Sequence, residues 1–74
     1  MLMTTMKPGH KVHVLEILND NPMARRLYEM GIMPGAEIEM LSRHPFKGPL
    51  IIKVGNTTLA LDRRIADSIV VEDC

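Results

Sequence analysis

Residues 50–61, with the sequence LIIKVGNTTLAL, carry the strongest structural signal in the chain. Two runs rich in β-branched and aliphatic residues are separated by Gly55 and Asn56, which tolerate the positive φ of a tight β-hairpin turn. The predicted register opposes three pairs on one face of the hairpin: Leu50 with Leu61, Ile52 with Leu59, and Val54 with Thr57.

Two further strands are predicted before this hairpin. Pro34 and Gly35 suit the centre of a type II turn, and residues 36–40 after it alternate apolar and acidic side chains, so that one face is dry and the other wet. Residues 11–18 form an earlier strand in which Val12 and Val14 share one face, whereas Leu15 and Ile17 share the other. This change predicts a β-bulge near Leu15, where the inward-facing register switches.

A short helix is predicted between those two strands. Asn21 caps its start, Pro22 occupies the first helical position, and the helix ends at Gly31. Gly31 can adopt the left-handed conformation of a Schellman cap, which would bring Leu27 against Ile32. The buried stripe of the helix is predicted to consist of three residues at spacings of four and three: Met23, Leu27 and Met30.

The remaining signals are a loop and a closing segment. Pro45, Gly48 and Pro49 mark a loop outside any central ladder. Asp62 is expected to cap a helical turn over residues 63–68, anchored by Ile65 and Ile69, before a last strand over residues 69–72. The chain is therefore predicted to be mainly β: a small, partly open β-barrel of about five strands, with one short helix after the first strand and a helical turn before the last.

Length and composition limit the classes of protein that this chain can be. Its 74 residues, 46% of them hydrophobic, suffice for a single domain spanning residues 1–74. Nine basic and nine acidic residues cancel, so the chain lacks the charge excess that draws proteins onto nucleic acid or anionic lipid. No apolar run is long enough for a membrane span, which argues against direct membrane insertion. One cysteine, Cys74, excludes an internal disulfide and favours a reducing, cytoplasmic location.

The sequence offers no clear catalytic, metal or cofactor site. His10 and His13 are three residues apart, a spacing that sends strand side chains to opposite faces, and His44 has no ligand nearby in sequence. No nucleophile motif or phosphate-binding glycine loop is present, so we expect no enzyme, no catalytic residue, no bound metal and no cofactor. With one Tyr, one Phe and no Trp, the stacking platforms of nucleic-acid-binding barrels are also missing.

Partner binding is the remaining class of function. Arg25 and Arg26, with Tyr28 and Glu29, are candidates for a partner-binding face of the helix, because Arg and Tyr are enriched among interface anchors. The alternative is a solvated face in which Arg25 and Glu29 form an i,i+4 pair. Several of the seven methionines could likewise serve as adaptable contact surface or fill the core.

Three segments of the chain resemble the FeoA family, the small ferrous iron transport protein A. Residues 24–38 resemble its helix-turn-strand signature, residues 46–50 its glycine-proline loop, and residues 59–72 its closing segment. The positions that carry most of this likeness are Leu27, Gly31, Gly35, Gly48 and Pro49.

The resemblance implies an SH3-like barrel and an accessory role beside FeoB, the membrane ferrous iron transporter with a cytoplasmic GTP-binding domain. We expect a cytoplasmic, non-enzymatic module that docks on FeoB and modulates Fe(II) uptake, with the residue 25–29 face and the Phe46-Lys47 loop as contacts. An arginine finger from Arg25 or Arg26 is one conceivable mechanism. The alternative function is a regulatory or oligomerisation module, as at the C-terminus of DtxR-type regulators, whose barrel edges pair with another copy or another domain.

Overall fold

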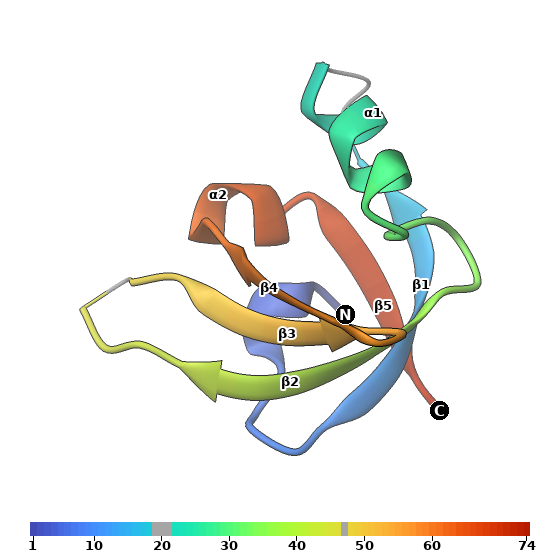
Figure 1. Ribbon diagram of the computed structural model, residues 1–74. Helices are drawn as coiled ribbons and strands as arrows, with labels where there is room; N and C mark the ends of the chain where they lie inside the picture. The colour runs from blue at the N-terminus through green and yellow to red at the C-terminus, as the bar shows by residue number, and fades with distance from the viewer. Residues whose placement is uncertain (19–21, 47) are drawn as a thin grey trace.

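The computed structural model describes residues 1–18, 22–46 and 48–74, and of Pro22 and Met23 only the backbone. Five antiparallel strands form one sheet in the order β4-β3-β2-β1-β5, and this sheet coils around its own core (Figure 1). The elements along the chain are η1 (Met3–Thr5), β1 (Lys11–Ile17), α1 (Pro22–Glu29), β2 (Glu37–Arg43), β3 (Leu50–Val54), β4 (Thr57–Leu61), α2 (Arg63–Ala66) and β5 (Ile69–Asp73). The predicted mainly β architecture of about five strands is confirmed.

The β3-β4 hairpin has the predicted register throughout. Leu50 lies opposite Leu61, Ile52 opposite Leu59 and Val54 opposite Thr57. Gly55, the first turn residue, has a φ of 59°, and among the described residues other than glycine only Phe46 has a positive φ. A positive φ at the first of two turn positions is the mark of a type II′ turn, whose twist matches that of the flanking strands.

The predicted bulge in β1 is present, but the side chain of Leu15 points to solvent and not to the core. The pairing of β1 with β5 shifts register between Val14 and Glu16. Val12 and Val14 are buried as expected, and Ile17 packs partly against the core. Leu15 is 46% exposed, so its predicted place on the inner face was wrong. The extra residue of a bulge is left out of the pairing, and here that residue is Leu15.

The turn at Pro34 and Gly35 leads into β2, as predicted. The Ala36 amide donates to the Met33 carbonyl at 2.9 Å, and Gly35 has a φ of 92°, a value that favours glycine. β2 continues to Arg43, three residues beyond the strand predicted from the alternation. Its pairing with β3 shifts register between Met40 and Ser42, which re-aims the strand and ends the simple alternation.

Helix α1 ends in the Schellman cap that the sequence predicts. The Ile32 amide donates to the Leu27 carbonyl at 2.8 Å, the Gly31 amide donates to Tyr28 at 3.0 Å, and Gly31 has a φ of 92°. Leu27 and Ile32 are both buried. Met30 is 37% exposed, so the prediction that it lies on the buried stripe was wrong, because the chain turns away immediately after Glu29. The predicted cap Asn21 and the side chain of Met23 lie outside the described residues.

The closing segment follows the prediction closely. The Asp62 side chain accepts a hydrogen bond from the Arg64 amide at 2.8 Å and so caps α2, which is two residues shorter than the predicted 63–68. Ile65 packs partly against the core, and Ile69 is fully buried at the start of β5. Residue 73 extends β5 by one position beyond the predicted strand.

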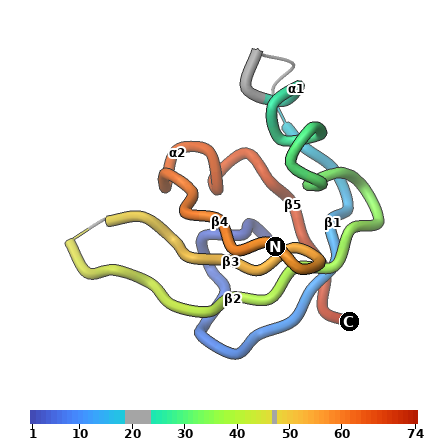
Figure 2. Tube along the Cα trace, in the orientation of Figure 1, coloured from blue at the N-terminus to red at the C-terminus, as the bar shows by residue number. Residues whose placement is uncertain are grey.

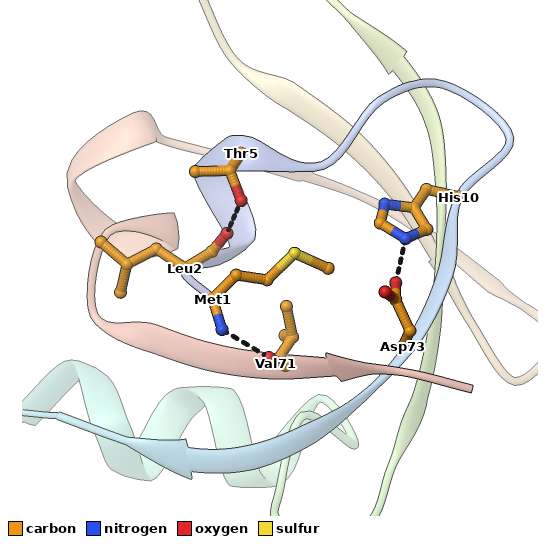
Figure 3. Close-up of polar contacts among 6 residues, drawn as sticks. All are labelled: Met1, Leu2, Thr5, His10, Val71 and Asp73. Atoms are coloured by element: carbon orange, nitrogen blue, oxygen red, sulfur yellow. Dashed lines mark hydrogen bonds and ion pairs between the residues drawn. The ribbon is translucent and has the colours of Figure 1, made fainter.

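The N-terminal segment is an integral part of the fold, which the sequence analysis did not foresee. The Met1 amino group donates to the Val71 carbonyl at 2.9 Å (Figure 3). The Val71 amide donates to the Met1 carbonyl at 2.7 Å, and Leu2 forms a β-bridge with Val70. Met3 and Met6 are completely buried. These two methionines therefore fill the core and do not serve as contact surface. The i,i+3 spacing of Met3 and Met6 was the available signal.

The core is wholly aliphatic and thioether in character, drawn from every strand and from both ends of the chain. No polar or charged residue is buried among those that the structure describes. Its members are Met3, Met6, Val12, Val14, Leu27, Ile32, Ile38, Met40, Leu50, Ile52, Val54, Leu61, Ala66, Ile69 and Val71.

Candidate interaction surfaces

The two histidines near the start of β1 each contact a different carboxylate of β5. His10 Nε2 contacts Asp73 Oδ1 (Figure 3), and His13 Nε2 lies 3.2 Å from Glu72 Oε2. Both carboxylates belong to β5, so the His13 pair joins the first and last strands, and the His10 pair joins the residue just before β1 to the last strand. Over residues 1–18, 22–46 and 48–74, no three or more His, Cys, Asp or Glu side chains form a group that could hold a metal ion.

The candidate face of α1 is open to solvent. Arg25, Arg26 and Glu29 are exposed, and Tyr28 is 46% exposed. The alternative interpretation, an i,i+4 ion pair between Arg25 and Glu29, is not borne out, because that pair is not formed. Within the described chain, the only contacts between a basic and an acidic side chain at ion-pair distance are those of His10 and His13. Figure 2 shows α1 standing beside the end of β1, away from the body of the sheet. The face therefore presents two arginines and one aromatic ring, and no carboxylate of residues 1–18, 22–46 or 48–74 forms an ion pair with these arginines.

The loop between β2 and β3 exposes the only phenylalanine of the chain. Phe46 is 99% exposed and has a φ of 59°, in the left-handed region that L side chains avoid. The loop is closed by two backbone hydrogen bonds, from His44 to the Pro49 carbonyl at 3.2 Å and from Gly48 to the Pro45 carbonyl at 3.1 Å. Lys47, the second predicted contact of this loop, lies outside the described residues.

Gly48 is required by this loop for a steric reason rather than a conformational one. A Cβ atom at this position would lie 2.8 Å from the Cβ of His44 and 3.1 Å from the Pro45 carbonyl oxygen. Carbon atoms do not approach that closely in folded proteins, so the turn that presents Phe46 depends on the missing side chain.

The two predicted contact regions are not brought together. The β2-β3 loop projects from one side of the sheet and α1 from another, as both views of the chain show (Figures 1 and 2). They therefore define two separate surfaces, and a small partner could bind only one of them at a time.

Two of the hollows among the described residues are lined mainly by charged side chains. One is lined by Lys11, Glu37, Glu39, Lys53 and Gly55 on the outer face of the sheet. Another lies beside α2 and is lined by Asp62, Arg63, Arg64 and Asp67. Neither is lined by histidine, cysteine or an aromatic ring, so neither has the residues of a nucleophilic or stacking site.

A row of alternating charge crosses the outer face of the sheet and was not predicted. Lys11 on β1 lies opposite Glu39 on β2, which lies opposite Lys53 on β3. Opposite charges across neighbouring strands stabilise a sheet by about 0.2–1 kcal/mol per pair. The sequence shows the individual charges, but the row depends on a pairing of β1 with β2 that joins residues far apart in the chain.

The fold and these surfaces are those of a small SH3-like domain with no recognisable catalytic apparatus in its described part. The crystal structure of Stenotrophomonas maltophilia FeoA complexed with zinc, a prokaryotic SH3 domain protein, superposes with a TM-score of 0.86 and 29% identity, covering 97% of this chain and 89% of that one. The family model for the FeoA domain matches residues 1–73. The chain belongs to the FeoA family, whose members are small accessory domains linked to ferrous iron transport.

Other solved structures agree with this assignment. Iron(II) transport protein A from Clostridium thermocellum is similar at 32% identity and a TM-score of 0.92 over 99% of this chain, which spans 45% of that one. An iron uptake regulatory protein (FeoA) is similar at 36% identity and a TM-score of 0.87, covering 100% of this chain and 96% of that one. A manganese-dependent transcriptional repressor shares the fold at 23% identity and a TM-score of 0.90, and the chain covers 41% of it. No curated protein sequence matches the chain.

One observation concerns membranes directly. None of the helices in the described part of the chain is long and apolar enough to cross a bilayer.

Proposed function

We propose that this protein is a cytoplasmic, non-enzymatic accessory module that docks on the cytoplasmic part of a FeoB-like ferrous iron transporter and modulates Fe(II) uptake. Membership of the FeoA family supports the link to ferrous iron transport. The related S. maltophilia protein has itself been put forward as a ferrous iron transport activating factor. Absence of a catalytic constellation in the described residues is consistent with a binding role rather than with chemistry.

The observation that carries the docking proposal is the state of Phe46. Its ring is 99% exposed and so contributes nothing to the core. Its backbone, at a φ of 59°, costs roughly 1–2 kcal/mol more than glycine would at the same place. A residue that is unfavourable for the isolated fold in both respects points to a use outside that fold, and a large apolar ring at a loop tip is a typical interface anchor.

The exposed face of α1 is the second contact region in this proposal. Arg25 and Arg26 offer exposed cations, and Tyr28 adds a half-exposed ring. Arg and Tyr are, with Trp, the residue types most enriched at binding hot spots. Because α1 and the Phe46 loop lie on different sides of the sheet, only a partner larger than this domain could contact both. The cytoplasmic part of a membrane transporter meets that requirement.

The proposal is tested by measuring the affinity of the protein for the isolated cytoplasmic part of the transporter by calorimetry. We expect Phe46→Gly to weaken binding by roughly 30-fold, the effect of losing one hot-spot side chain of about 2 kcal/mol. Leu15→Ala is the matched control, because Leu15 is 46% exposed on β1 and belongs to neither contact region. Equal affinities of the wild type, Phe46→Gly and Leu15→Ala would refute the role of the loop.

The α1 face and its mechanism need a separate experiment. GTP hydrolysis by the transporter domain is measured alone, with the protein, and with Arg25→Ala or Arg26→Ala. An arginine finger acting on that domain would raise the rate by orders of magnitude and lose the increase in one of the two variants. Docking without a finger predicts unchanged hydrolysis and weaker binding by both variants. Unchanged binding as well would remove this face from the proposal.

The manganese-dependent repressor contains a domain of the same fold, and this chain covers 41% of it. That likeness supports the alternative function. In that alternative the domain serves as a regulatory or oligomerisation module. Ferrous uptake distinguishes the two, because deletion of the protein slows Fe(II) uptake in the first and leaves it unchanged in the second.

A further inference from the structure

The two edges of the sheet are treated differently. The edge at β5 is covered, because Met1 exchanges two backbone hydrogen bonds with Val71 and Leu2 bridges Val70. The edge at β4 pairs with β3 on one side, and within the described chain no backbone hydrogen bond reaches it from the other. In Figure 1, β4 is the last strand of the sheet beyond β3. An uncovered strand edge is a template for pairing with another strand.

The hairpin register identifies the free groups on that edge. In an antiparallel hairpin with a two-residue turn, the pair that closes the turn, here Val54 and Thr57, is hydrogen-bonded, and bonded pairs then alternate along the ladder. Thr57, Leu59 and Leu61 therefore direct their backbone groups toward β3. Thr58 and Ala60 direct their N–H and C=O groups outward. β4 thus offers two donors and two acceptors in the spacing of an antiparallel ladder.

β4 also lacks the features that natural edges use to prevent pairing. Its sequence, TTLAL, contains no charged residue and no proline. Its pairing with β3 runs without a register shift, so no bulge twists the edge away. Thr58 and Ala60 are both exposed, so a second strand can approach them.

We propose that the β4 edge is a self-association surface, on which two copies of this chain pair β4 with β4 about a two-fold axis through Leu59. In this register Thr58 of one copy lies opposite Ala60 of the other, and the four outward N–H groups of the two strands donate to the four outward carbonyls. Isologous two-fold pairing satisfies every free backbone group on both edges at once. It joins the two sheets into one continuous sheet of ten strands, five from each copy.

The side chains fit this register. The two Leu59 residues meet as a non-hydrogen-bonded pair on the inner face, where cross-strand side chains come closest, and each is already half-buried against its own core.

The absence of charged residues from β4 permits a second copy at this edge. The nearest charged side chain on the neighbouring strand is that of Lys53 on β3, which lies opposite Thr58 on β4. In the dimer the two Lys53 residues are three strand spacings apart across the sheet and offset by two residues along it, so they are separated by more than about 14 Å, beyond the ~8 Å screening length of physiological salt. At β5 the N-terminal segment already occupies the edge, so β4 is the edge left for a second copy.

The proposal is tested by sedimentation equilibrium of the full chain over a range of concentrations, together with amide hydrogen exchange. We expect a reversible monomer-dimer equilibrium, and exchange at the Thr58 and Ala60 amides that slows as the concentration rises. Replacing both residues with lysine (Thr58→Lys and Ala60→Lys) puts two like-charged pairs across the interface and should raise the dissociation constant by roughly 2- to 30-fold. Ser42→Lys, at an exposed β2 position in the same cross-strand row, is the matched control and should leave the dissociation constant unchanged.

A charge-complementary mixture distinguishes this interface from any other. A chain carrying glutamate at both positions (Thr58→Glu and Ala60→Glu) should fail to pair with itself but form a one-to-one heterodimer with the double-lysine chain. Circular dichroism of each variant checks that the monomer is folded. A wild-type chain that stays monomeric at millimolar concentration overturns the proposal. So does dimerisation that is insensitive to the double substitution, or a mixture that gives no heterodimer. None of these measurements involves the transporter.

Discussion

Truncation of Met6 to alanine tests whether the N-terminal segment is part of the core. Met6 is completely buried, and its carbonyl accepts a 2.6 Å hydrogen bond from Arg43 Nη1 that ties the segment to β2. Alanine removes the buried thioether chain but keeps this backbone bond. Met→Ala changes at buried sites cost about 2–5 kcal/mol, whereas a chain of this length has a total stability of only about 4–11 kcal/mol. We therefore expect a loss of one-fifth of the stability at the least, and near-complete unfolding at the most.

The assay is urea and thermal unfolding followed by far-ultraviolet circular dichroism, because the chain has no Trp and a single Tyr. For a domain of this size, 1 kcal/mol moves Tm by roughly 4–8 °C, so Met6→Ala should lower Tm by at least about 8 °C. Met33→Ala is the matched control, since it deletes the same atoms from a side chain that is 40% exposed. If the two variants unfold at the same midpoint, the N-terminal segment does not pack as described and the reasoning fails.

Three further predictions concern the turns and the outer face of the sheet. Gly31→Ala should cost roughly 1–2 kcal/mol in urea unfolding through its positive φ, because the new Cβ meets its nearest neighbour only at an ordinary 3.5 Å, and Gly31→Asn should cost less. Equal losses would show that sterics dominate there. Gly48→Ala should also destabilise the protein, but through its 2.8 Å clash with His44, so that His44→Gly in the same chain restores part of the loss. Absence of that rescue would contradict the clash. Glu39→Lys creates a row of three lysines across neighbouring strands and should cost about 0.4–2 kcal/mol at low salt, a penalty that shrinks in 1 M salt. A loss independent of salt would rule out repulsion as its cause.

Local signals predicted the parts of the fold that depend on a few consecutive residues. The turn at Gly55 and Asn56 set the register of β3 against β4, and the Gly31 cap ended α1 where a Schellman motif requires. The bulge in β1 was visible as a change in alternation, but the orientation of Leu15 was not. A bulged residue leaves the pairing, and the strand sequence alone does not say which residue that is.

The candidate surfaces were predicted as residue types but not as places. Phe46 stood out in the sequence as the only phenylalanine of a chain with 3% aromatic residues. Its full exposure and left-handed backbone emerged only from the loop that His44 and Gly48 close. The separation of this loop from α1 depends on how the sheet coils, which no local pattern encodes.

By itself, the amino-acid sequence determined which segments become strands, where they turn and which family the chain resembles, because turn geometry and side-chain alternation act over a few bonds. Only the tertiary structure decided that Met3 and Met6 complete the core, that Lys11, Glu39 and Lys53 form one row, and that β5 is covered while β4 is left open. These features join residues distant in the chain, and they exist only when the whole sheet has closed around its apolar side chains.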